Sequence, residues 1–238
     1  YAEYSKNKFL EANHYISNCE YPFIQLNVLN PKYQSYSEEY WDSRKIAPSA
    51  VIFHLGVSKK IEFLKHHNLF FDEDFDSHLD EIYNKKKFPS KPLFYVCCPS
   101  KTDDSIIPSD TMENIFILIP VSTDTNPTKE TIDFYFNYVM NKLEKYEGSK
   151  IVSNIIEKVC YTKNDFISEY NSYKGNAYGL ANTLTQTATF KPKISDKKIK
   201  NLSYCGHFTV PGPGVPPSII SGKIVSNILE KRYEKKLR

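Results

Sequence analysis

Residues 201–225 (NLSYCGHFTVPGPGVPPSIISGKIV) constrain the fold of this chain more than any other segment. A short strand is predicted to run to Gly206, and a helix is predicted to begin near Pro217. Between them, the loop at residues 210–217 consists only of valine, proline and glycine. Because proline fixes φ, such a loop is stiff although it has no regular structure. The segment therefore predicts a rigid connection that leads from a strand into a helix.

Two roles are open for this connection. Glycines at positions 206, 212 and 214 remove side chains where a bulky planar ligand would lie against the backbone. The first turn of the helix adds free N–H groups and a partial positive charge, which suit a pyrophosphate or a reduced, anionic ring. A proline- and glycine-rich connection is, however, most often only a turn. The residues alone leave both roles open.

The rest of the chain predicts a mixture of strands and helices. Helical spacing predicts one helix after the acidic residues 72–74, with Phe75 and Ile82 on its apolar face, and a longer one at residues 128–146. Residues 31–49 predict a connection with one helical turn, whereas residues 150–161 leave the type of element open. Short apolar runs predict strands at residues 11–18, 50–57, 67–71, 93–98, 115–121 and 202–205. This mixture predicts an α/β fold.

The composition excludes several classes of protein. With 238 residues, of which 40% are hydrophobic, the chain can bury a sizeable core. A net charge of only +3, from interspersed acids and bases, argues against a nucleic-acid-binding protein. No apolar run approaches the roughly 20 residues of a membrane-spanning helix, and the polar start shows no signal peptide. The chain is expected to be soluble or bound at a membrane surface, and its start at Tyr1 without a methionine suggests a processed or truncated product.

The cysteines and histidines do not predict a metal site or a disulfide framework. Five cysteines without CxxC spacing favour a reducing compartment. On a strand, the adjacent Cys97 and Cys98 point to opposite faces. By the same alternation, the adjacent His66 and His67 face opposite ways and do not bind one ion together.

Other polar clusters have ordinary explanations. The carboxylates at residues 72–74 and 103–104 are predicted to cap helices and to lie in solvated loops. The basic runs at residues 85–87 and 231–238 are either solvated or in contact with anionic lipid. His207 is predicted to orient the loop by a structural hydrogen bond, with proton transfer as the alternative. The sequence contains no Gly-x-Ser-x-Gly elbow and no P-loop, so hydrolase and NTPase functions are unsupported.

Motifs spread from residue 17 to residue 216 resemble the FAD-dependent carotenoid desaturases of the bacterial phytoene desaturase type, which are amine-oxidase-like flavoenzymes. The C-terminal signature of that family is similar to residues 184–192 (LTQTATFKP) and to the glycines and prolines of the loop. Residues 19–20 are Cys-Glu, where the family usually has Ala-Asp. Further motifs match in the family's order at residues 17–21 (SNCEY), 47–49 (APS), 55–56 (LG), 66–71 (HHNLFF), 99–103 (PSKTD) and 175–179 (GNAYG).

The resemblance implies the C-terminal part of a two-domain FAD-dependent oxidoreductase. Its glutathione-reductase-like flavin domain would contain residues 1–22 and 172–238, and its substrate domain, a mixed sheet with helices, would contain residues 23–171. The catalytic residues are not identified, because those proposed for the family lie in an earlier part of its chain. The residues that the resemblance places beside the flavin are Gly206, His207, Thr209, Gly212, Gly214, Val215 and Pro216.

An activity is implied as well. It is the desaturation of a long, apolar carotenoid such as phytoene, by hydride transfer from an allylic C–H to the flavin and loss of a proton from the neighbouring carbon. Residues from about 45 to 170 would shape an apolar channel for this substrate. The enzyme would be cytoplasmic and peripheral to the membrane, from which it draws its substrate. A carotenoid isomerase, or a desaturase of a different polyene, is the alternative within the family.

One part of the family pattern is missing. The family binds the ADP half of FAD with a Gly-x-Gly-x-x-Gly loop between a strand and a helix, and these 238 residues contain no such loop. A missing N-terminal dinucleotide-binding segment is therefore the expected partner of this chain, and FAD binding without it is expected to be weak. The alternative from another class of function is a non-catalytic fragment that binds isoprenoids.

Overall fold

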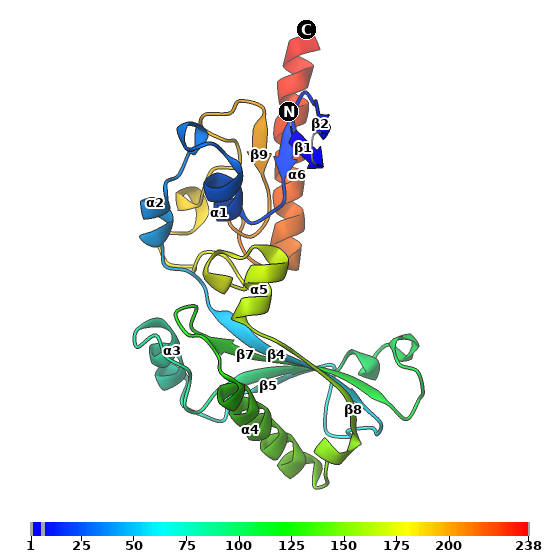
Figure 1. Ribbon diagram of the computed structural model, residues 1–238. Helices are drawn as coiled ribbons and strands as arrows, with labels where there is room; N and C mark the ends of the chain where they lie inside the picture. The colour runs from blue at the N-terminus through cyan, green and yellow to red at the C-terminus, as the bar shows by residue number, and fades with distance from the viewer. Residues whose placement is uncertain (1, 6–7, 238) are drawn as a thin grey trace. The chain divides into compact units, whose positions relative to one another are not determined.

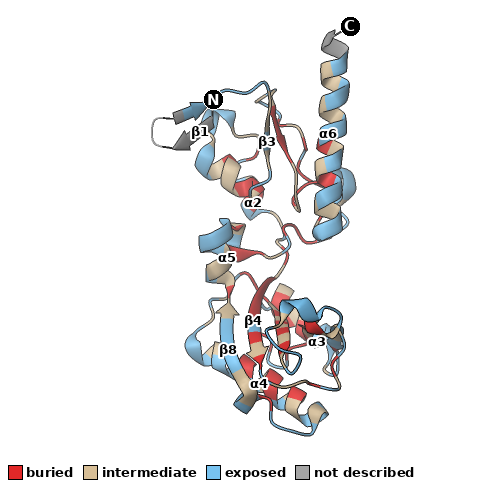
Figure 2. Ribbon diagram, turned by 90° about the vertical axis from the view of Figure 1, so that its right-hand side faces the viewer, coloured by how far each residue is buried: buried red, intermediate tan, exposed pale blue. Residues whose placement is uncertain are grey.

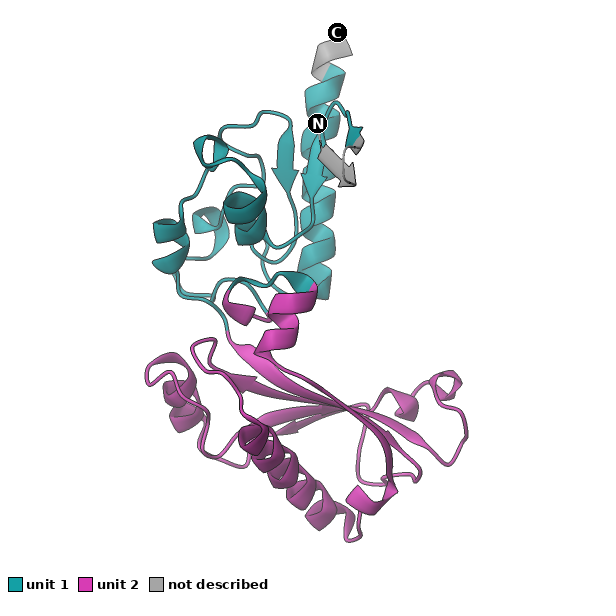
Figure 3. Cartoon of the chain, viewed as in Figure 1, with its two compact units in different colours: residues 1–47, 170–173, 178–238 teal, residues 48–169, 174–177 magenta. Residues whose placement is uncertain are grey.

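A computed structural model describes residues 2–5 and 8–237. The chain forms two compact units, which are coloured separately in Figure 3. Unit 1 comprises residues 1–47, 170–173 and 178–238, and unit 2 comprises residues 48–169 and 174–177. The sequence predicts a first domain boundary at residue 22, whereas unit 1 continues to residue 47. The chain returns to unit 1 at residue 170, close to the predicted boundary at residue 171.

Unit 2 is built on a five-stranded sheet in the order β5-β6-β7-β4-β8 (Figure 1). All of its strand pairs are antiparallel, and β4 and β7 pair along their full length from Ser49–Val121 to Val57–Glu113. The parallel pair of unit 1, described below, completes the mixed α/β fold that the sequence predicts. The strands of unit 2 are β4 (Ser49–Val57), β5 (His67–Phe70), β6 (Phe94–Cys97), β7 (Glu113–Val121) and β8 (Ile155–Tyr161).

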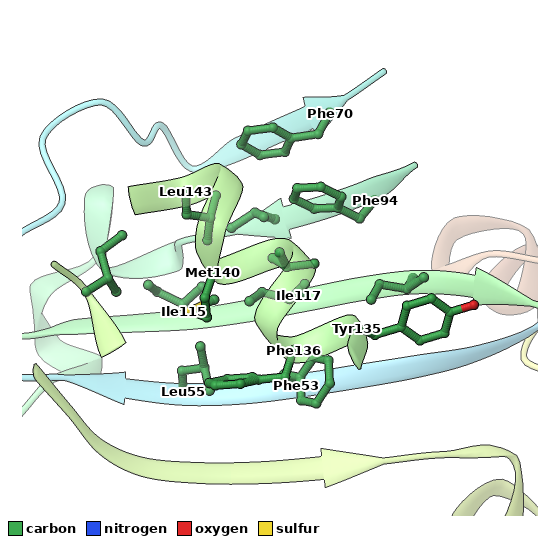
Figure 4. Packing of buried hydrophobic residues seen from close by; sticks show 14 of the residues in the cluster. Phe53, Leu55, Phe70, Phe94, Ile115, Ile117, Tyr135, Phe136, Met140 and Leu143 are labelled. Atoms are coloured by element: carbon green, nitrogen blue, oxygen red, sulfur yellow. The ribbon is translucent and has the colours of Figure 1, made fainter. Parts of the chain in front are cut away.

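The long helix α4 (Lys129–Glu147) packs on one face of this sheet (Figure 4). The Thr128 hydroxyl accepts the N–H of Thr131 at 3.3 Å and caps its start, and Gly148 ends it with a φ of 71°. Full burial of one large apolar side chain contributes about 1.5–3 kcal/mol to stability. Because α4 and the sheet bury many such side chains together, their interface forms the main core of unit 2. The helix contributes the residues at the predicted spacing, namely Tyr135, Phe136, Val139, Met140 and Leu143.

A row of aromatic rings crosses the other face of the sheet. It runs from Tyr95 on β6 over Phe116 on β7 and His54 on β4 to Tyr161 on β8, with centroid separations of 6.2, 5.2 and 6.0 Å. Within unit 2 these rings are half-buried or exposed. Because side chains alternate along a strand, Ile115 and Ile117 face α4 while Phe116 joins this row.

Unit 1 contains a parallel pair of short strands, β3 (Tyr15–Ser17) and β9 (Leu202–Tyr204), and the antiparallel pair β1 (Ala2–Ser5) and β2 (Lys8–Leu10). Its helices are α1 (Tyr21–Phe23), α2 (Glu38–Asp42) and α6 (Val215–Leu237). Tyr21 and Tyr204 stack at a centroid distance of 3.8 Å in a core of aromatic residues. Figure 2 shows that α6 is exposed or half-buried along the part whose side chains are described, where only Ser221 and Val225 are buried.

Two helices differ from the prediction. In α3 (Phe75–Tyr83), Phe75 is 51% exposed, whereas His78, Glu81 and Ile82 are buried. The chain after the helix explains this face, because Ser90 and Leu93 donate their N–H groups to Glu81 and His78 at 2.7 and 3.3 Å. The helix α5 (Lys163–Tyr170) was not predicted, and it buries none of its residues.

Most other elements agree with the sequence prediction. Strands form within each of the six predicted segments, and residues 31–49 contain the short helix α2. Residues 150–161, whose type was open, end in the strand β8.

Candidate functional site

The proline–glycine loop connects β9 with α6 inside unit 1. Gly206, Gly212 and Gly214 have φ values of 108°, 138° and 111°. Residues with a Cβ rarely adopt these angles, so the path of the loop itself requires glycine at the three positions. A Cβ on Gly212 would in addition lie 3.2 Å from Cε of Lys191. The three glycines are therefore needed for the backbone conformation of the loop, in addition to the room that they could leave for a planar ligand.

Two hydrogen bonds fix the start of the loop. Ser221 Oγ accepts the N–H of Gly206 at 2.7 Å, which ties the loop to the second turn of α6. Thr209 is fully buried and donates its hydroxyl to the carbonyl of Gly206 at 2.9 Å. Thr209 therefore supports the loop from within.

His207 is held by a carboxylate. Its Nε2 lies 3.0 Å from Oε2 of Glu20, and Glu20 also accepts the N–H of Tyr173 at 2.8 Å. A Cβ on Gly179 would lie 2.9 Å from Cδ2 of the imidazole. His207 thus joins several segments of unit 1, which fits the interpretation as a structural residue that orients the loop.

The remaining predicted site residues, Gly214, Val215 and Pro216, form the exposed start of α6. The helix begins at Val215 rather than near Pro217, so two prolines occupy its first turn. Proline has no N–H, and Ser218 already donates its N–H to the carbonyl of Gly214 at 3.0 Å. Within the described residues, the N–H groups of Gly214 and Val215 and the helix dipole are left to attract an anion at this end, which is less than the sequence suggested.

A buried lysine beside the loop provides further positive charge. Lys191 is 3% exposed, and within the described part of the chain its Nζ has no hydrogen-bond partner. Burial lowers the pKa of this amine below its ordinary value. Because a buried ammonium without a counter-ion is costly, the site suits a bound anion. The sequence did not identify Lys191 as a site residue, since only the folded loop brings it beside Gly212.

These features fit the FAD that the family resemblance implies. The cofactor has an anionic pyrophosphate, and its ring gains negative charge on reduction. Lys191 and the start of α6 offer positive charge, and the glycine loop offers backbone without side chains. The residues that would hold the cofactor are Lys191, Gly212, Gly214 and Val215.

The sequence argument against a joint His66–His67 site is wrong. His66 precedes β5, so strand alternation does not separate the pair, and the two ring centroids are 4.3 Å apart. A ligand atom from each histidine and the sulfur of Cys97 all lie within 4.8 Å of one another. In contrast, the opposite orientation of Cys97 and Cys98 is confirmed, because Cys98 is fully buried and Cys97 is only partly buried.

Comparison with known proteins extends the resemblance. Over 214 residues the chain is 34% identical to the carotenoid 3,4-desaturase of Haloarcula japonica. This alignment covers 90% of this chain and 43% of that protein. It is 29% identical to the 4,4'-diapophytoene desaturase (4,4'-diaponeurosporene-forming) of Staphylococcus haemolyticus, over 92% of this chain and 45% of that protein. It is 28% identical to a 4,4'-diaponeurosporene oxygenase of Staphylococcus aureus, over 96% of this chain and 46% of that protein. The chain spans less than half the length of these relatives.

No protein-family model matches the chain. Among solved structures, an oxidoreductase from Methanosarcina mazei superimposes with a TM-score of 0.50 at 12% identity, over 94% of this chain and 44% of that one. This likeness concerns the fold, and it agrees with the α/β architecture described above. The order of the motifs and the 34% identity along nine-tenths of the chain show that it belongs to the carotenoid desaturase family.

Proposed function

We propose that this chain is part of an FAD-dependent enzyme that desaturates a long, apolar carotenoid such as phytoene. The observation that carries the proposal is the 34% identity over 214 residues to a carotenoid 3,4-desaturase. In this proposal unit 1 closes over the flavin, and unit 2 receives the substrate. Because the chain spans less than half of its relatives, the activity is proposed for the complete enzyme and not for these 238 residues alone.

Unit 1 binds and orients the cofactor in this proposal. FAD, when bound, accepts the two electrons that leave with the substrate's hydrogen atoms. Lys191 and the start of α6 stabilise negative charge on the cofactor. Hydrogen bonds from Thr209, Ser221 and the His207–Glu20 pair hold the loop against the rest of unit 1.

Unit 2 offers an apolar surface for the substrate. The aromatic row on the sheet presents ring faces and edges, which suit the π system of a polyene. A hollow of about 400 Å³ lies on unit 2 and is lined by His54 of that row and by apolar side chains such as Ile106, Ile156 and Val159. Glu113 and Glu157 also line the hollow, so the carotenoid would contact its apolar part. Transfer of a hydrocarbon from water to apolar side chains is favourable, which supports this placement of the substrate.

A dinucleotide-binding segment completes the enzyme in this proposal. The parallel pair β3–β9 has only three residues in each strand, and Ile16 is 52% exposed. Parallel strands are normally buried inside larger sheets, so this pair suits the addition of further strands. A groove of about 860 Å³ in unit 1 includes residues of both strands and apolar side chains such as Phe9, Val28 and Tyr33. This surface is the proposed docking site of that segment.

The reaction product tests the proposed activity. The similarity to a 4,4'-diaponeurosporene oxygenase favours oxygenation as the second candidate, and an isomerase is the third. We expect the complete enzyme, incubated with FAD and phytoene in liposomes, to yield a product whose mass has fallen by that of two hydrogen atoms for each new double bond. Mass spectrometry distinguishes the three reactions, because oxygenation adds the mass of oxygen and isomerisation leaves the mass unchanged. Either of those two products would overturn the desaturase proposal.

Contact with the membrane surface is proposed for unit 2. Within the described residues, every helix is too short or too polar to cross a bilayer. Phe134 is 49% exposed, and Phe71 and Phe75 are 58% and 51% exposed. Tyr138, in contrast, packs partly against the core and donates its hydroxyl to Glu73 at 2.9 Å. Exposed aromatic side chains of this size suit the interface of a bilayer.

We expect the double variant Phe134→Ser with Phe75→Ser to bind liposomes several-fold more weakly, as measured by flotation. Its melting temperature should change little, since both rings are half exposed. Val152→Ser is the matched control, because Val152 is 45% exposed in unit 2 and does not line the proposed substrate hollow. Equal loss of binding in the control, or unchanged binding of the double variant, would show that these aromatics do not contact the membrane.

A further inference from the structure

We propose that His66, His67 and Cys97 form a zinc site at the β5 edge of the sheet in unit 2. The three side chains offer ligand atoms that all lie within 4.8 Å of one another. Two of these atoms lie closer than that limit, because Sγ of Cys97 is 3.9 Å from Nδ1 of His67. Around a tetrahedral Zn²⁺, ligand atoms are about 3.3–3.6 Å apart, given bond lengths of about 2.0–2.3 Å. Side-chain rotations that move these atoms by about 1 Å would complete the geometry.

The backbone brings the ligands together. His67 on β5 lies directly opposite Cys97 on β6 in their antiparallel register. His66 is held beside them, because its carbonyl accepts the N–H of Cys98 at 2.8 Å. The ligands therefore come from β5, from the residue before it and from the neighbouring β6. They are placed before any metal binds, which lowers the cost of ordering them.

The polar surroundings orient both imidazoles. Thr102 Oγ1 lies 2.5 Å from Nδ1 of His66, and the Tyr95 hydroxyl lies 2.5 Å from Nδ1 of His67. In metal sites, a polar partner on one ring nitrogen fixes the orientation of the ring and leaves the other nitrogen for the ion, which is Nε2 in His66. In His67, Nδ1 lies beside both the Tyr95 hydroxyl and Sγ of Cys97, so an ion bound through Nδ1 would displace that hydroxyl. Neither histidine is buried, and His67 is exposed, so an ion can reach the site from solvent.

The donor set selects the metal. One thiolate and two imidazoles suit Zn²⁺, whereas Mg²⁺ and Ca²⁺ prefer oxygen ligands. Three protein ligands leave the fourth position to water or to another ligand. β5 is an edge strand that pairs only with β6 in this sheet. A metal bound by His66, His67 and Cys97 would hold the edge strand β5 to β6, and this stabilisation of the edge is the role that we assign to the site.

Cobalt and zinc titrations of the reduced chain test the proposal. We expect one equivalent of Co²⁺ to produce the visible bands of a tetrahedral ion together with a sulfur-to-cobalt charge-transfer band, and Zn²⁺ to displace it. Cys97→Ser should remove the charge-transfer band and weaken Zn²⁺ binding by more than about 100-fold, because even outer-shell partners are worth about 10- to 100-fold. His67→Ala should weaken binding to a similar extent, and bound Zn²⁺ should slow hydrogen exchange in β5.

Cys19→Ser is the matched control, because Cys19 is an exposed thiol in unit 1. It should bind Co²⁺ and Zn²⁺ like the unmodified chain. Circular dichroism of each variant checks that the chain is folded, and both substituted side chains reach the surface, so folding should persist. The proposal is wrong if the unmodified chain gives no thiolate band, or if that band survives Cys97→Ser.

Discussion

Lys191→Met is expected to weaken FAD binding by the complete enzyme about 100-fold, the effect of losing one hydrogen bond to a charged group in a buried site. Lys191 is 3% exposed beside Gly212, and its Nζ is unpaired within the described residues. The anionic cofactor is the counter-ion that we propose for it. Binding is measured by fluorescence titration of FAD. Lys193→Met is the matched control, since Lys193 is exposed two residues away and should leave the affinity unchanged.

The same substitution should have the opposite effect on stability when no cofactor is present. Removing an unpaired buried ammonium is expected to raise the free energy of unfolding of this chain by about 1–3 kcal/mol near neutral pH. Burial lowers the pKa of Lys191 in the folded state below the ordinary value of 10.5. The folded chain then loses this proton before the unfolded chain does, so the stability of the unmodified chain rises as the pH increases from the lowered pKa toward 10.5.

The difference in stability between Lys191→Met and the unmodified chain should therefore shrink across that pH range. Urea unfolding at neutral pH and at a pH near 10 measures it. Taking the difference between the two proteins cancels the titration of the tyrosines, which both share. A variant that is less stable at neutral pH, and binds FAD as tightly as before, would show that Lys191 has an unrecognised partner and no role toward the cofactor.

Much of the fold follows from local sequence patterns. The alternation along β7 and the helical spacing of α4 each identify a buried face. In the structure these two faces pack in the same hydrophobic core. Residues 155–161 gave no such pattern because β8 is an edge strand with most of its side chains exposed on both faces. The helix α5 was missed for a similar reason, since a helix that buries no residue has no apolar stripe to recognise.

The candidate site was only partly predictable. The loop at residues 210–217 is visible in the sequence, since its glycines and prolines are adjacent in the chain. Lys191 is not, because nothing near it in sequence distinguishes a buried lysine from a solvated one. The cluster of His66, His67 and Cys97 likewise depends on the register between β5 and β6. Both are long-range juxtapositions, which local periodicity does not encode.

FAD retention is the second large effect that we expect. The ribose and pyrophosphate contacts of a dinucleotide-binding loop supply much of the affinity in such sites, and no Gly-x-Gly-x-x-Gly loop occurs in these 238 residues. The chain alone is therefore expected to retain little FAD after gel filtration. The complete enzyme, or the chain combined with a dinucleotide-binding segment that docks at the β3–β9 edge, should retain it.

The most direct test of this account is the FAD content of the two forms, determined by absorbance after equilibrium dialysis. We expect about one FAD per molecule for the chain combined with the segment, and almost none for the chain alone. Ile16→Lys, at the exposed edge of β3, should abolish the gain by blocking the segment, since Ile16 is 52% exposed. Tightly held, stoichiometric FAD in the chain alone, or no FAD in either form, would contradict the proposal that unit 1 is one side of a flavin site completed by another segment.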